Sequence, residues 1–189
     1  MPPKGHAVLS ASSSDRWLHC PPSARLCESY DDKGSDYAAE GTDAHALCEY
    51  KLRKALGIEA EDPTKSLTWC SEEMDDCASG YVTYVLEQIE VAKQVCSDSV
   101  VLIEQRVDFS RWVEGGFGTA DALIIADGTL KICDYKHGLG VLVRAEENPQ
   151  LMCYALGALE LFDNIYDIET VSMTIYQPRR DNVSTYEIS

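Results

Sequence analysis

The sequence predicts a single α/β domain in which helices flank a mixed sheet. Three observations lead to this class. Hydrophobic residues make up 45% of the 189 residues and charged residues 25%, which is typical of a globular protein and not of a disordered chain. Two segments with helical periodicity precede three strand-like segments. A further helix and one or two strands follow, so the order is that of a mixed fold.

Apolar spacing and end signals mark the helices of the N-terminal half. A short helix is expected at Ser13–Leu18, because Cys20-Pro21-Pro22 stops it. A polar loop over 28–40 leads to a second helix, Thr42–Ala55. The next helix spans Ser71–Val95, whose serine serves as the N-cap and whose first turn carries two glutamates.

The C-terminal half alternates strands with one helix. The expected strands are Val100–Phe109, Phe117–Ala126, Thr129–Lys136, Val171–Gln177 and Ser184–Ile188. The helix begins at Pro149, since proline suits the first helical position, and continues to Phe162. No repeat or linker divides the chain, so residues 1–189 are expected to form one domain. The chain stops directly after a strand, which leaves open that a C-terminal segment is missing.

Charge and cysteines narrow the classes of function. With 16 basic and 32 acidic residues the net charge is −16, which argues against non-specific attraction to nucleic acid or anionic membranes but leaves room for a local basic groove. The eight cysteines form no CxxC pair, so neither a zinc ribbon nor a disulfide scaffold is expected. No apolar run reaches the roughly 20 residues of a membrane span, and the N-terminus lacks the apolar core of a signal peptide. We expect a cytoplasmic protein that does not bind membranes.

A pair of carboxylates is the most informative feature. Asp127-Gly128 between two β-rich runs is a strong hairpin signal. If these two residues form the turn, Asp121 lies directly opposite Asp134, and alternation places Lys136 on the same face.

The neighbours on that face are otherwise apolar, namely Leu123, Ile125, Leu130 and Ile132. Two carboxylates with Cβ atoms about 5 Å apart repel each other, so a buried pair needs a shared proton or a cation. Two oxygen ligands with open coordination positions suit Mg²⁺ or Mn²⁺. The alternative is a hairpin edge whose acids face water.

These residues also carry a family resemblance. Gly118-Thr119-Ala120-Asp121, twelve further residues and Asp134-Tyr135-Lys136 resemble the core of the PD-(D/E)XK nuclease superfamily, in its RecB-like branch. Gln150 and Tyr154 match the QxxxY motif of that branch, and Gly41, His45 and Glu49 match its GxxxHxxxE motif. Trp17, Cys20 and Pro21 near the N-terminus are also similar. The arrangement is most like uncharacterised nucleases encoded by phages and prophages, and it implies a restriction-endonuclease-like core.

The resemblance implies a role for each matched position. Asp121 and Asp134 would bind the catalytic metal together with the backbone carbonyl of Tyr135, and His45 would be a further ligand. Lys136 would act on the attacking water.

Gln150 and Tyr154 would border the DNA. Glu49 is a weak candidate that would contact the metal, orient His45 or pair with Arg53. Glu104 is equally weak, because it is expected on the strand face opposite Val101, Ile103 and Val107, either near the ligands or in water. Some relatives bind an iron–sulfur cluster, but no cysteine follows Cys153 here, so none is expected.

Two functions from different classes remain open. One is a Mg²⁺- or Mn²⁺-dependent deoxyribonuclease, expected to be an exonuclease of phage or prophage DNA metabolism in the cytoplasm of a bacterial host. The other, motivated by the charge of −16, is a non-catalytic DNA mimic that binds a host or phage protein. Nothing in the sequence indicates an oligomeric state.

Overall fold

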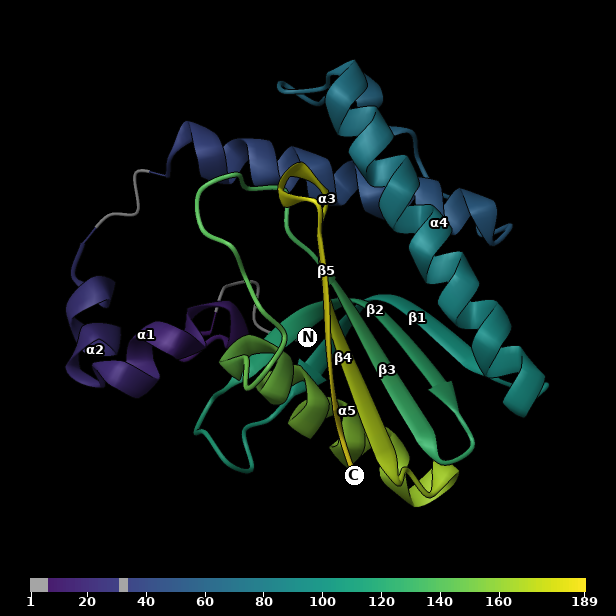
Figure 1. Cartoon of the computed structure of the whole chain (residues 1–189). Coiled ribbons are helices and arrows are strands. Elements are labelled where there is room, and N and C mark those ends of the chain that lie inside the picture. The colour runs from purple at the N-terminus through teal and green to yellow at the C-terminus, as the bar shows by residue number, and fades with distance from the viewer. Residues whose placement is uncertain (1–6, 31–33) are drawn as a thin grey trace.

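The structure, a computed structural model, describes residues 7–30 and 34–189 as one mixed sheet with helices on both sides (Figure 1). The helices are α1 (Ser14–His19), α2 (Pro22–Glu28), α3 (Asp36–Ala55), α4 (Glu72–Val95) and α5 (Pro149–Tyr166). The strands are β1 (Val100–Asp108), β2 (Phe117–Ala126), β3 (Thr129–Tyr135), β4 (Thr170–Gln177) and β5 (Asn182–Ile188). The predicted α/β class is confirmed, and the fold is consistent with a restriction-endonuclease-like core.

The strands lie in the sheet in chain order, and the connection between β3 and β4 sets their direction. All neighbouring strands are antiparallel except β3 and β4, which are parallel. A parallel pair needs a long crossover, and α5 supplies it. As a result, the first turn of α5 lies near the end of β3, where the candidate site residues are.

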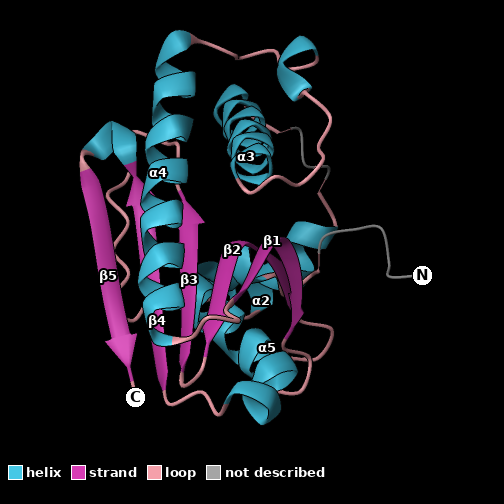
Figure 2. Ribbon diagram, turned by 90° about the vertical axis from the view of Figure 1, so that its right-hand side faces the viewer, coloured by secondary structure: helices cyan, strands magenta, loops and turns pink. Residues whose placement is uncertain are grey.

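Two apolar layers separate the helices from the sheet. The helices α3 and α4 cover one face, and α5 covers the other (Figure 2). Buried Leu47 and Tyr81 belong to the first layer, while Leu123, Ile132 and Leu151 belong to the second. The sheet is therefore buried on both sides, and a charged side chain on β2 or β3 needs a partner.

The predicted hairpin between β2 and β3 is confirmed. Ala126 pairs with Thr129 and the register continues to Ala122 and Cys133, with Gly128 in the left-handed region at φ 72°. The ladder stops one pair short of Asp121 and Asp134. There the carboxylate of Asp121 accepts a hydrogen bond of 2.7 Å from the Tyr135 backbone N–H, in place of a partner from the strand.

Two helix boundaries differ from the prediction. The helix α3 begins at Asp36 and not at Thr42, because the Ser35 hydroxyl accepts a hydrogen bond from the Ala38 N–H and caps a polar first turn. Periodicity could not detect that turn, since it has no apolar stripe. Part of the predicted loop, 31–33, lies outside the described residues. The helix α2 was also missed, because Pro22 begins a helix instead of ending one.

The remaining elements agree with the prediction within a few residues. The helix α4 has Ser71 as its N-cap, with the hydroxyl accepting from the Met74 N–H. The helix α5 is capped by Asn148 and extends four residues beyond Phe162. Among the described residues, no helix is both long and apolar enough to span a membrane.

Candidate metal centre

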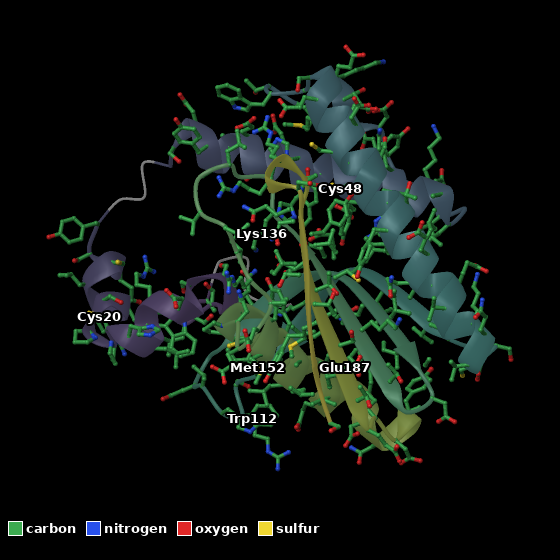
Figure 3. The ribbon with its side chains drawn as sticks, viewed as in Figure 1. Cys20, Cys48, Trp112, Lys136, Met152 and Glu187 are labelled. Carbon is green, nitrogen blue, oxygen red and sulfur yellow. The ribbon has the colours of Figure 1, made fainter. Side chains whose placement is uncertain are left out.

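The two predicted carboxylates lie at one end of the sheet and are largely buried. Asp134 is 1% exposed, and the side chain of Asp121 is 11% exposed. The alternative of a hairpin edge with its acids in water is therefore wrong. Figure 3 shows Lys136 at this end of the sheet, beneath α3 and far from Trp112 and Cys20.

On the α5 side of the centre, polar side chains form a closed network. The Lys136 ammonium lies 2.8 Å from Asp134 Oδ2 and donates a hydrogen bond of 2.9 Å to Gln150 Oε1. The Gln150 amide donates to Asp134 Oδ1 at 3.1 Å and to the Tyr154 hydroxyl at 2.8 Å. Gln150 and Tyr154 therefore share a helix face, as a spacing of four residues predicts, and the glutamine contacts both the lysine and the carboxylate.

On the α3 side, three side chains from three elements converge. His45 Nδ1 lies 3.2 Å from Asp121 Oδ1. His45, Asp121 and Glu104 each offer one ligand atom, and these atoms lie within 4.8 Å of one another. The structure thus brings the predicted histidine to Asp121 and adds Glu104 as a full member of the cluster, whereas Asp134 is not one of the three residues whose ligand atoms converge.

The position of Glu104 corrects the sequence prediction, which left it either near the ligands or in water. Ile103 pairs with Ala122 and Gln105 with Ala120, so Glu104 lies opposite Asp121 with no residue inserted. Its backbone adopts φ 50°, a left-handed conformation that is strained in a glutamate. Simple alternation fails there: Ile103 packs in the layer with α3 and α4, but Val107 packs in the layer with α5.

Glu49, the other weak candidate, is not in the cluster of ligand atoms. It accepts a hydrogen bond of 2.8 Å from Arg53 Nε, and Arg53 donates to the Ile103 carbonyl at 3.3 Å. Of the three roles considered for it, the structure places it in the pairing with Arg53.

The charges of the cluster perturb its pKa values in opposite directions. Burial lowers the pKa of His45, but attraction and hydrogen bonding to Asp121 outweigh it and raise that pKa to about 9. Burial, together with repulsion from Asp121, raises the pKa of Glu104 to about 7. Burial also raises the pKa of Asp134, whereas His45 holds that of Asp121 below its usual value despite burial. The imidazolium therefore acts as the cation of this site.

The donor set fits a divalent cation. Among the described residues, the buried Asp134 Oδ2 has no hydrogen bond, although the Lys136 ammonium lies beside it. Carboxylate oxygens and one imidazole nitrogen match the ligand preferences of Mn²⁺ and, less closely, Mg²⁺. The ligand role of the Tyr135 carbonyl stays a prediction. Cys20 is free and exposed.

A second network of polar side chains, around His137 and Arg179, was not predicted. The Tyr135 hydroxyl bonds His137 Nδ1 at 2.8 Å, and Arg179 pairs with Glu40 at 2.8 Å and with Glu73 at 3.0 Å. His137 lies off the face of the carboxylates, as alternation predicts. The acidic partners of Arg179 come from α3 and α4, so sequence spacing held no signal for this network.

Fold and site together define an α/β protein with a buried cluster of carboxylates and a histidine. The chain belongs to the family described as protein of unknown function DUF2800, which matches residues 6–189. A solved structure described as the crystal structure of SSO0001 is 16% identical, with a TM-score of 0.26, over 76% of this chain and 75% of that one. That likeness is too low to support a conclusion about fold or function.

Proposed function

We propose that this protein is a Mg²⁺- or Mn²⁺-dependent deoxyribonuclease of the RecB-like branch of the PD-(D/E)XK superfamily. The observation that carries the proposal is the position of Lys136. Its ammonium lies between Asp134 and Gln150, next to two buried carboxylates that need a cation. A DNA mimic needs acidic side chains on its surface and has no use for this buried arrangement.

Each residue of the centre has a defined task in this proposal. When bound, the metal supplies an activated water and stabilises charge on the phosphate. Asp121, Asp134 and His45 hold it. Glu104 either joins them or accepts a proton from the water.

Lys136 orients the attacking water and offsets the negative charge that develops on the phosphate. Gln150 fixes the ammonium through its carbonyl oxygen and one carboxylate oxygen of Asp134 through its amide. Tyr154 in turn accepts from the same amide. A small hollow beside this tyrosine, lined by Ser10, Ser12 and Thr119, leaves room for the sugar–phosphate backbone.

We further propose that the enzyme acts on phage or prophage DNA in the cytoplasm of a bacterial host. The test is incubation of the protein with linear and circular DNA in Mg²⁺, Mn²⁺ or EDTA. An exonuclease is expected to degrade linear DNA but not circular DNA, and to do so only when a metal is present. Asp127→Asn, which removes an exposed carboxylate at the turn of the same hairpin, is the matched control and should cleave normally. Absence of cleavage with either metal contradicts the proposal and leaves the DNA mimic.

A further inference from the structure

A cavity of about 500 Å³ lies beside the candidate metal centre and has no part in the chemistry proposed above. Tyr37 and Glu40 of α3, residues 137–140 after β3, and Arg179 line it. Its volume is that of a ligand pocket, for which roughly 300–1,000 Å³ is usual. The Tyr135 ring links the two, since its centroid lies 5.5 Å from that of His45 and 5.9 Å from that of His137, so the cavity adjoins the centre.

One residue that lines this cavity, His137, carries a buried nitrogen that makes no hydrogen bond among the described residues. The side chain of His137 is 2% exposed and its Nδ1 is bonded to the Tyr135 hydroxyl. Its Nε2 has no hydrogen bond among the described residues; the nearest acidic atom is Glu40 Oε1 at 3.5 Å. A buried nitrogen that makes no hydrogen bond destabilises the folded state unless a ligand or a water molecule forms that hydrogen bond.

The charges of the cavity exclude a phosphate as that ligand. Arg179 is bound by Glu40 at 2.8 Å and by Glu73 at 3.0 and 3.1 Å. A phosphate would meet the Glu40 carboxylate, and the Arg179 guanidinium beside it is already paired with Glu40 and Glu73, so little attraction is left for an anion. A neutral group with hydrogen-bond donors for Glu40 and a polar atom for His137 fits instead.

The walls of the cavity suit a flat ring. Tyr37 is 87% exposed and Leu139 is 55% exposed, an unusual exposure for two large side chains that line one hollow. The loop that carries Leu139 is fixed: the buried Gln177 amide donates to the Gly138 and Val141 carbonyls, both at 2.8 Å. Arg180 donates to the Leu139 carbonyl at 3.3 Å. Leu139 is therefore held in place through its backbone, and Tyr37 is carried by the first turn of α3.

We propose that this cavity binds an unpaired nucleobase of the DNA strand whose phosphate lies at the metal centre. The base stacks on Tyr37, and its polar edge meets His137 Nε2 and the Glu40 carboxylate. Paired bases cannot enter, so the substrate is single-stranded DNA or a frayed duplex end. The inference deepens the proposed nuclease function and rests on it for the identity of the ligand as DNA.

The experiment measures base stacking in the full chain, in EDTA, without reference to cleavage. Single-stranded oligonucleotides carry the fluorescent base 2-aminopurine at successive positions from one end. We expect strong quenching at one position or a few adjacent ones. Stacking on an aromatic ring contributes enough that Tyr37→Ala should weaken DNA binding roughly 5- to 150-fold and remove the quenching. Tyr37→Phe keeps the ring and should behave as the native protein.

Tyr30→Ala is the matched control, because Tyr30 is also 71% exposed but does not line the cavity. The inference is overturned if the quenching is unchanged in Tyr37→Ala. It is also overturned if no position is quenched or if the protein does not bind the DNA. An abasic residue at the quenched position should weaken binding as much as Tyr37→Ala does. If metal-dependent cleavage occurs while Tyr37→Ala alters neither quenching nor affinity, only this inference fails. If the base stacks on Tyr37 but no metal supports cleavage, the proposed nuclease function fails and the pocket stands.

Discussion

The two sides of the candidate metal centre solve the problem of buried charge differently. On the α5 side, Asp134 is held by Lys136 and Gln150, and the network closes on Tyr154. On the α3 side, Asp121 faces one histidine and a second carboxylate, that of Glu104. On the first side the protein supplies an ammonium and an amide to Asp134, whereas the second depends on a protonated imidazole.

This difference separates two tasks. The α5 side holds its lysine in one position through contacts with Asp134 and Gln150, as a group that acts on water or phosphate requires. The α3 side uses the His45 proton where a cation would otherwise sit. In the proposed mechanism a metal replaces that proton, because an imidazole ligand must be neutral. Four changes test whether the two sides are separable in this way.

The largest effect is expected from a substitution of Asp134, because this carboxylate is both a proposed metal ligand and the partner of Lys136. Asp134→Asn should lower metal-dependent DNA cleavage about 1,000-fold or more, because it removes a charged ligand and the partner of Lys136. It should not unfold the metal-free protein, since a buried group with a raised pKa gives up its charge. Cleavage rates and thermal melting measure the two effects. Unchanged cleavage would exclude the metal centre.

A substitution of Lys136 tests the α5 side alone. Lys136→Ala should lower turnover about 100-fold while Mn²⁺ affinity stays near the native value, because the ammonium touches the water and phosphate and not the metal. Calorimetric titration of Mn²⁺ gives the affinity. A loss of affinity as large as that of Asp134→Asn contradicts the separation and makes the lysine a support for the carboxylates.

His45 tests the α3 side alone. His45→Ala should weaken Mn²⁺ binding by at least about tenfold, because one ligand from α3 is lost. Arg53→Gln, which removes the pair with Glu49 and the hydrogen bond to the Ile103 carbonyl but no proposed ligand, serves as control and should bind Mn²⁺ normally. Native affinity in His45→Ala places the histidine outside the coordination sphere.

The smallest effect is a pH dependence of the metal-free fold. The pKa of His45 rises from 6.5 to about 9 on folding, so its stabilisation is complete below pH 6.5 and is lost as pH rises through 9. The pKa of Glu104 rises from 4.5 to about 7, so its neutral form favours folding and that stability is lost as pH rises through 7. Both act in the same direction. Because the imidazole is about one-third exposed, solvent weakens its interactions, and we expect the free energy of unfolding to fall by only about 1 to 2 kcal/mol between pH 6 and 9.

Denaturant unfolding in EDTA at several pH values measures this loss. His45→Ala should flatten the profile above pH 7, and saturating Mn²⁺ should reverse it, because the metal binds the neutral imidazole. A metal-free protein that becomes more stable between pH 7 and 9 contradicts the assignment of the α3 side.

The α5 side was predictable from sequence, and the α3 side was predictable only in part. Asp127-Gly128 fixed the hairpin register, and alternation placed Asp121, Asp134 and Lys136. Helical spacing placed Gln150 and Tyr154 together. Glu104 was only a weak candidate because alternation assumes an extended backbone, and this residue departs from it at φ 50°. The network of His137 and Arg179 was missed because its members are far apart in the chain.

The crossover that makes β3 and β4 parallel also sets the order in which the centre is assembled during synthesis. The hairpin of β2 and β3 closes locally, but Lys136 is fixed through its backbone N–H to the Tyr176 carbonyl, and this residue lies 40 positions later. Such a distant pairing costs loop-closure entropy and forms late. A chain still being translated thus carries both carboxylates without a completed centre. The proposed nuclease would therefore gain its activity only after β4 has been synthesised.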